Sequence, residues 1–148
     1  MLVRDALIPT PLTVQPSATL LEFIHMILNS NQTNAVVVDN GILKGLLSAS
    51  DVYRRLVPHY IAMDDRLAPA VHESYVEEQW EKFKHHRAHE VMVTELDTLP
   101  PDASIMQAVS LFVKQGRKTV PVVDEGSRYV GSVTRRSVLQ LFAQRVGR

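Results

Sequence analysis

The sequence predicts a mixed α/β (α+β) fold built from two copies of one β-α-β-β-α unit. Three observations lead to this prediction. The chain matches itself when it is shifted by 85 residues, each half carries helical patterns around short β-branched runs, and hydrophobic residues make up 45% of the 148 residues. That share supports a real core, and the length fits one ordinary domain or two small, mutually dependent ones.

The internal repeat shows as identical or similar residues at a fixed spacing. The matched pairs are Thr13 with Thr98, Pro16 with Pro101, Ala18 with Ala103 and Asp39 with Asp124 and, after one extra residue in the second copy, Gly45 with Gly131 and Val52 with Val138. Self-similarity of this kind indicates duplicated structural units. We therefore expect one repeat over residues 1–57, a linker over 58–88 and a second repeat over 89–148.

Each repeat is predicted to open with a short strand, near Thr13 or Thr98, and to continue into an amphipathic helix. Ser17 and Asp102 precede the two helices and are the predicted N-caps. Apolar residues at helical spacing define the helices in both copies. They are Leu20, Leu21, Phe23, Ile24, Ile27 and Leu28 in the first copy and Ile105, Met106, Ala108, Val109, Phe112 and Val113 in the second.

A β-branched run follows each helix, at residues 35–38 and 120–123. Its continuous apolarity is typical of a strand buried on both faces. A turn and a second strand, at residues 42–47 and 129–133, complete a hairpin in each copy. A final helix begins near Ser50 or Arg136. Its predicted buried residues are Val52, Tyr53 and Leu56 in the first copy and Val138, Leu139 and Phe142 in the second.

The linker is predicted to contain one amphipathic helix, at about residues 74–87. Pro58 and Pro69 exclude a continuous helix before it, and Ser74 with Glu77 has the capping-box pattern. The predicted helix has an apolar stripe of Val76, Trp80 and Phe83 and an exposed pair of Glu78 and Lys82.

The charge balance and composition exclude several classes of function. The 16 Lys and Arg residues balance 16 Asp and Glu residues, which argues against nucleic-acid binding and against a polybasic membrane anchor. The chain has no cysteine, so disulfides and thiolate chemistry are excluded. We see no signal peptide and no apolar run of membrane-spanning length. We therefore expect a cytoplasmic protein with no membrane and no nucleic acid among its partners.

The two units resemble the CBS domain, a module found in pairs in the kinase gamma subunit, in IMP dehydrogenase and in many stand-alone prokaryotic proteins. The matching runs are VPVVD at 120–124 with GSVT at 131–134, AVVVD at 35–39 with GLLSASD at 45–51, and the lead-in segments 3–7 and 90–92. The resemblance implies a pair packed about a pseudo-twofold axis with two symmetry-related clefts. It further implies AMP, ADP, ATP or S-adenosylmethionine as ligand and a homodimer of two pairs.

Ser48 and Asp51 suit a nucleotide because they lie at a strand-to-helix junction. A carboxylate at Asp51 can accept two hydrogen bonds from the vicinal diol of a ribose. The Ser48 hydroxyl can donate to a phosphate oxygen beside the free N–H groups of the helix. Gly45 would permit close approach of the backbone to the ligand. The competing interpretation is that both residues only cap the helix.

The base and the phosphates of a nucleotide require further residues. Ile8, Val14 and Val93 are predicted to sandwich the flat purine, and basic residues of the second copy to meet the phosphates. For Arg135 and Arg136 the alternative is a solvated surface pair. The full set of candidate nucleotide-binding residues is Ile8, Val14, Asn34, Ser48, Asp51, Arg117, Lys118, Thr119, Thr134, Arg135 and Arg136.

Two departures from the family pattern leave the ligand open. Ser137 stands where the second motif usually has its carboxylate, so a ribose grip is expected only at the Asp51 cleft. Ile8 and Val93 replace a frequent threonine after the lead-in, which removes a polar contact near the base.

No enzymatic or metal motif emerges from the sequence. Glu81, His85 and His89 have helical metal-ligand spacing, but a charged, solvated face is the expected explanation. We predict no catalytic residue, no metal and no required cofactor. The predicted function is a regulatory sensor of an adenine nucleotide that signals to an unknown effector protein. The alternatives are a ligand-free dimerisation module, an S-adenosylmethionine binder, and a metal-binding or enzymatic role of the histidine-rich linker.

Overall fold

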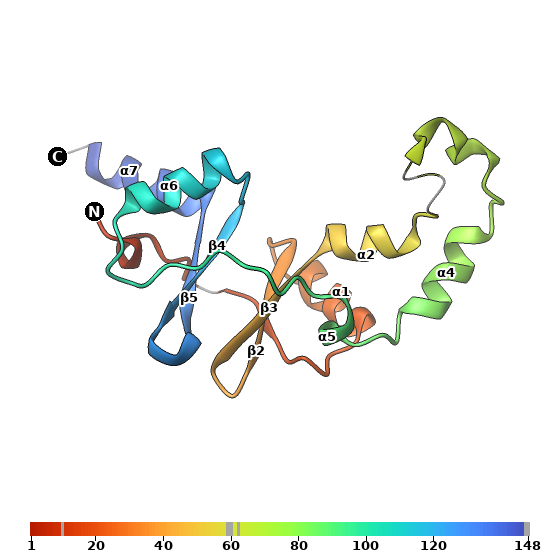
Figure 1. The fold of residues 1–148 in the computed structure, drawn as a ribbon, viewed down its shortest axis with the longest axis horizontal. Coiled ribbons are helices and arrows are strands. Elements are labelled where there is room, and N and C mark those ends of the chain that lie inside the picture. Colours follow the sequence, from red (N-terminus) through yellow and green to blue (C-terminus); the bar gives the residue numbers. More distant parts are fainter. Residues whose placement is uncertain (10, 59–60, 62, 147–148) are drawn as a thin grey trace.

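The structure is a computed structural model that describes residues 1–9, 11–58, 61 and 63–146 (Figure 1). The described strands form one five-stranded sheet in the order β1-β2-β3-β5-β4, so the predicted mixed α/β fold is confirmed. The strands are β1 (Thr13–Val14), β2 (Asn34–Asp39), β3 (Ile42–Ser48), β4 (Thr119–Asp124) and β5 (Arg128–Thr134). β1 runs parallel to β2, and every other neighbouring pair is antiparallel.

The two β-hairpins share one register, in agreement with the sequence repeat. The β2–β3 hairpin has its bulge between Val37 and Val38, and the β4–β5 hairpin has its bulge between Val122 and Val123. Val36, Val37, Val120 and Val122 are almost completely buried, as continuous apolar strands predict. The expected strand near Thr98 is reduced to a single parallel bridge at the neighbouring Leu99.

Each hairpin is followed and preceded by a helix, as predicted. The helices are α1 (Leu20–Leu28) and α2 (Ala49–Leu56) in the first half, and α6 (Ile105–Lys114) and α7 (Arg135–Val146) in the second. The predicted N-caps Ser17 and Asp102 were wrong, because Thr19 and Ser104 occupy the N-cap positions. A turn closed by the Ala18 N–H and the Gln15 carbonyl, 3.0 Å apart, delays the start of α1 by two residues.

The lead-in segments of the two repeats are exchanged: the lead-in of each repeat packs against the other repeat. The 3₁₀ helix η1 (Val3–Ala6) lies in the second half, where the Val3 N–H donates to the Ala103 carbonyl at 2.8 Å. Conversely, α5 (Ala88–Val91) lies in the first half, where the Ala88 N–H donates to the Ala18 carbonyl at 2.7 Å. Figure 1 shows η1 beside α6 and α7, and α5 beside α1. The boundaries at 57/58 and 88/89 stay a prediction, because each half takes residues from both sides of the linker.

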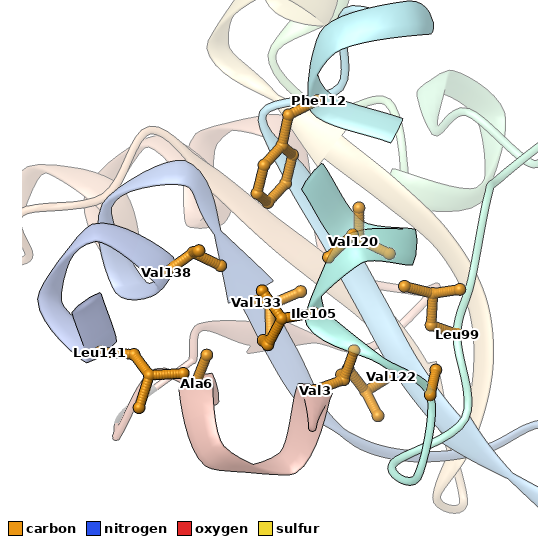
Figure 2. Close-up of a cluster of buried hydrophobic side chains, with 12 residues drawn as sticks. Val3, Ala6, Leu99, Ile105, Phe112, Val120, Val122, Val133, Val138 and Leu141 are labelled. Atoms are coloured by element: carbon orange, nitrogen blue, oxygen red, sulfur yellow. The ribbon is translucent and has the colours of Figure 1, made fainter. Parts of the chain in front are cut away.

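The exchange also joins the two hydrophobic cores to distant parts of the chain. Val3 and Ala6 are buried in the second core among Leu99, Val122 and Leu141 (Figure 2). Ala88 is completely buried in the first core, and the linker residues Trp80 and Phe83 pack against that core. Each core is therefore complete only when both halves of the chain contribute to it.

The linker differs from the single helix predicted for it. It forms η2 (Asp65–Ala70), α4 (Tyr75–Phe83) and then α5, because the chain turns at residues 84–87. Ser74 makes no side-chain cap to α4, and its hydroxyl instead donates to Glu78 Oε1 at 3.2 Å. Within the described residues, no helix is long and apolar enough to cross a membrane.

The last helix of each repeat buries fewer apolar residues than predicted. Val52 and Val138 are buried, but Tyr53 and Leu139 are 65% and 64% exposed, and Phe142 is 36% exposed. α2 and α7 each contact the sheet by one narrow face. In α7 this face buries Leu141, which was not among the predicted buried residues. The outer faces of α2 and α7 therefore carry Tyr53, Leu139 and Phe142 as accessible apolar side chains among polar ones.

Candidate functional site

Two clefts lie where the first and second repeats meet. We name them the Ser48 cleft, of about 350 Å³, and the Thr134 cleft, of about 470 Å³. Both volumes fall in the range of small-molecule sites. The Ser48 cleft is lined by Thr33, Asn34, Leu46, Ser48, Ala49, Ser50, Arg54, Gly116, Arg117, Lys118 and Thr119. The Thr134 cleft is lined by Ile8, Pro9, Asn31, Gln32, Thr33, Asn34, Lys118, Thr119, Thr134, Arg136, Ser137 and Gln140.

A larger hollow of about 520 Å³ lies elsewhere, next to Arg4 and Asp124. Neither the Ser48 motif nor the Thr134 motif lines it, and its residues come from η1 and the second repeat. We therefore place the candidate site at the two clefts, where both repeats and both motifs contribute side chains.

The two clefts share one wall. Thr33, Asn34, Lys118 and Thr119 line both of them. Asn34 and Thr119 occupy equivalent positions of the two repeats, and Asn34 Nδ2 donates to Thr119 Oγ1 at 3.2 Å. This hydrogen bond therefore joins the two repeats at the centre of the candidate site.

Asp51 closes a capping box at the start of α2. Its Oδ2 accepts from the Ser48 N–H at 2.8 Å and from the Ser48 hydroxyl at 3.0 Å. Its Oδ1 accepts from the guanidinium of Arg54, one helical turn later. Asp51 is 5% exposed, whereas Ser48, Ser50 and Arg54 line the cleft beside it. The carboxylate is thus held directly behind the cleft wall with both oxygens engaged.

The second repeat builds the same cap without a carboxylate. The Ser137 hydroxyl accepts from the Thr134 N–H at 2.8 Å, and the Ser137 N–H donates to Thr134 Oγ1 at 3.0 Å. Ser137 is buried and lines the Thr134 cleft. The second motif can therefore have Ser137 in place of the acidic residue and still cap the start of α7.

The predicted cations have three different surroundings. Arg117 Nε donates to Asp97 Oδ2 at 2.9 Å while lining the Ser48 cleft. Lys118 is exposed and lines both clefts, and Arg136 lines only the Thr134 cleft. Arg135 points elsewhere: it donates to the Arg117 and Phe112 carbonyls at 2.9 and 3.0 Å, and it lines neither cleft.

The predicted aliphatic residues are not brought together. Ile8 lines the Thr134 cleft. Val93 joins Leu46, a lining residue of the Ser48 cleft, through two backbone hydrogen bonds of 2.9 Å. Val14 is 5% exposed within the first core and borders a separate hollow next to Arg87. Exchange of the lead-ins places Ile8 and Val93 beside different clefts, which the sequence order did not show.

Two further residues differ from the sequence analysis. Gly45 permits a close approach to its backbone, but the group that approaches is Val93 of the same chain and not a ligand. A Cβ at Gly45 would lie 2.8 Å from the Val93 carbonyl oxygen. Arg54 was missed as a site residue, although its i,i+3 spacing from Asp51 on a helix was a usable signal.

The histidine-rich linker shows a different set of contacts. Within the part of the chain that the structure describes, no group of three or more His, Asp or Glu residues is placed to hold a metal ion. Glu81 forms an ion pair with Lys84 at 2.8 Å, and His86 Nδ1 lies 3.2 Å from Glu90 Oε2.

Comparison with known proteins identifies the family. The family model of the CBS domain matches residues 3–58 and 88–144, so the chain belongs to the CBS-domain family and carries two copies. An uncharacterised protein of Methanocaldococcus jannaschii, MJ1426, is 27% identical over 95% of this chain and 90% of its own length. The CBS domain of a membrane protein from Sphaerobacter thermophilus is 31% identical, with a TM-score of 0.72 over 95% of this chain and 87% of that one.

Two further solved structures carry ligands. The CBS domain pair of protein MJ0100, in complex with 5′-methylthioadenosine and S-adenosyl-L-methionine, has a TM-score of 0.70 at 21% identity and covers 98% of each chain. CBSX2 in complex with AMP has a TM-score of 0.74 at 17% identity, over 99% of this chain and 98% of that one. At these identities the likeness shows a shared fold.

Proposed function

We propose that this CBS pair is a non-catalytic regulatory module that binds an adenine nucleotide in the Ser48 cleft. One observation carries the proposal. The first repeat lines this cleft with Ser48 and the start of α2, and the second repeat lines it with Arg117 and Lys118. A hydroxyl, a buried carboxylate behind it and cations in the same cleft match the ribose and phosphates of AMP, ADP or ATP.

Signalling follows from the position of the cleft between the repeats. A ligand that contacts both repeats favours the relative arrangement of the repeats in which both contacts form. A partner protein that recognises the same arrangement then binds more tightly in the presence of the nucleotide. The complexes of MJ0100 and CBSX2 with adenosine compounds support this proposal, because both proteins share the fold.

Thermal unfolding against a panel of AMP, ADP, ATP, GTP, NAD and S-adenosylmethionine tests the proposal. At about 1 mM, a ligand with a Kd near 10 μM adds roughly 2.7 kcal/mol of stability, which raises the Tm by several degrees. We expect a selective rise with an adenine nucleotide. Equal Tm values with and without every compound would contradict nucleotide sensing and favour the ligand-free dimerisation module.

The Asp51→Asn variant tests the role assigned to the carboxylate. Asparagine retains one acceptor oxygen for the Ser48 N–H, so the cap of α2 is largely preserved. It accepts fewer hydrogen bonds from a ribose diol, and we expect a weaker affinity for the nucleotide. Unchanged affinity would remove Asp51 from the site while leaving the proposed function in place.

We also propose a homodimer formed through the outer faces of α2 and α7. Tyr53 and Leu139, at equivalent positions of these helices, are 65% and 64% exposed. Light scattering after gel filtration tests this proposal. The double variant Tyr53→Ser/Leu139→Ser is expected to be monomeric, whereas Leu28→Ser, a change at a 74% exposed residue of α1, is expected to remain dimeric. A monomeric wild-type protein would contradict the homodimer.

A further inference from the structure

The charges that line the Ser48 cleft are all of one sign. Arg54, Arg117 and Lys118 line it, and none of its described lining residues is an aspartate or glutamate. Two of these cations are paired with carboxylates that do not line the cleft: Asp51 pairs with Arg54, and Asp97 pairs with Arg117. The cavity surface itself is therefore basic.

Arg54 has a second property that sets it apart from the other cations. Its guanidinium binds the carboxylate that the proposed function assigns to the ribose, and its side chain is 67% exposed, against 6% for Asp51. Arg54 is thus an exposed surface group that holds one oxygen of a buried carboxylate. When Arg54 leaves Asp51 Oδ1, both acceptor sites of this oxygen become available to a ribose.

We infer that Arg54 makes the Ser48 cleft selective for a phosphate-bearing nucleotide over uncharged or cationic adenosine compounds. This inference rests on the proposed function and names its ligand class. A phosphate or polyphosphate gives Arg54 a new bidentate partner of the same chemistry as a carboxylate. Arg54 then exchanges one anion for another, and Asp51 Oδ1 is released to accept from the ribose.

Ligands without a phosphate gain less from this exchange. Adenosine provides no anion for Arg54, so freeing Asp51 would leave an exposed guanidinium unpaired and cost the Asp51–Arg54 interaction. S-adenosylmethionine offers Arg54 one α-carboxylate, but its sulfonium and α-ammonium add two positive charges, which would meet Arg54, Arg117 and Lys118 without a lining carboxylate to balance them. The same geometry therefore favours AMP, ADP or ATP and disfavours both other compounds.

Titration calorimetry with AMP, adenosine and S-adenosylmethionine tests the inference on three proteins: wild type, Arg54→Gln and Arg55→Gln. Arg55 is the matched control, because it lies on the same helix, donates to the Glu90 carbonyl at 2.8 Å and does not line the cleft. Charge-assisted hydrogen bonds contribute enough that we expect Arg54→Gln to weaken AMP binding roughly 10- to 100-fold. Adenosine binding should stay unchanged or strengthen, and Arg55→Gln should behave as wild type.

The outcomes separate this inference from the proposed function. If wild type binds adenosine as tightly as AMP, or if Arg54→Gln keeps the wild-type preference for AMP, the selectivity assigned to Arg54 is wrong while adenine sensing stands. If none of the three compounds binds wild type, both are wrong. A measurement without any variant adds a check: raising the salt concentration should weaken AMP binding and leave adenosine binding unchanged.

Discussion

Replacing Gly45 by alanine is expected to disrupt the crossing of the exchanged lead-in over β3. A Cβ at this position would lie 2.7 Å from Met92 Sδ and 2.8 Å from the Val93 carbonyl oxygen. The flexible Met92 side chain can move aside. Val93 cannot do so freely, because its N–H and carbonyl both bond to Leu46 at 2.9 Å.

The magnitude follows from these two contributions. Overpacking costs about 1–3 kcal/mol, and weakening a backbone hydrogen bond adds roughly 0.5–1.5 kcal/mol. We expect Gly45→Ala to lower the free energy of unfolding by about 1.5–4.5 kcal/mol, and so to lower the Tm by roughly 3–18 °C. Urea denaturation followed by circular dichroism measures the change.

Gly131 supplies the matched control, because it is the equivalent residue of the second repeat. The three atoms nearest to a Cβ there all belong to the Leu7 side chain, and the first of them, Cδ2, lies at 3.2 Å. Leu7 can adjust its terminal methyl groups, so Gly131→Ala should cost about 1 kcal/mol or less. A Gly45→Ala protein as stable as wild type, or a Gly131→Ala protein just as unstable, would refute the reasoning.

Three further predictions follow from particular contacts. Thr19→Ala should lower the free energy of unfolding by about 1 kcal/mol in urea denaturation, because Thr19 Oγ1 accepts from the Glu22 N–H at 3.1 Å; Ser17→Ala should change it little. Asn34→Ala should lower it by roughly 0.5–1.5 kcal/mol through loss of the hydrogen bond between the repeats, and an unchanged stability would show that this bond contributes nothing. Burial raises the pKa of Tyr129 above its usual value of 10.0, against a smaller lowering by the Ser132 hydroxyl. The stability that this shift contributes is complete below pH 10.0 and is lost as the pH rises through the raised pKa of Tyr129. Tyrosinate absorbance should therefore show a late-titrating group that Tyr129→Phe abolishes.

Much of the fold could be predicted because the two repeats carry the same local signals. Continuous β-branched runs before a turn identified both hairpins, and the duplicated register made their equivalence visible. The N-caps were missed for a local reason. Both Ser17 and Thr19 are good capping residues, and the turn that selects Thr19 depends on a backbone hydrogen bond.

The candidate site was predicted less completely, because it depends on contacts between distant residues. Asp51 was recognised from its motif. Its partner Arg54 was identified only from the structure, in which α2 brings the two side chains together. Ile8 and Val93 were assigned to one purine site, whereas the exchanged lead-ins carry them to different clefts. Spacing along the chain determines neighbours on one helix or strand, and it does not determine which half a lead-in joins.

The exchange of lead-ins has a consequence for how this chain acquires its structure during synthesis. The first core cannot close until residues 88–93 have been made, about thirty residues after the end of α2, and their long sequence separation adds a loop-closure cost. Residues 3–6, made first, have no core to join until the second hairpin and α7 exist. The first repeat can therefore reach its native packing once residues 88–93 have been made, whereas the second repeat must wait until the chain is nearly complete.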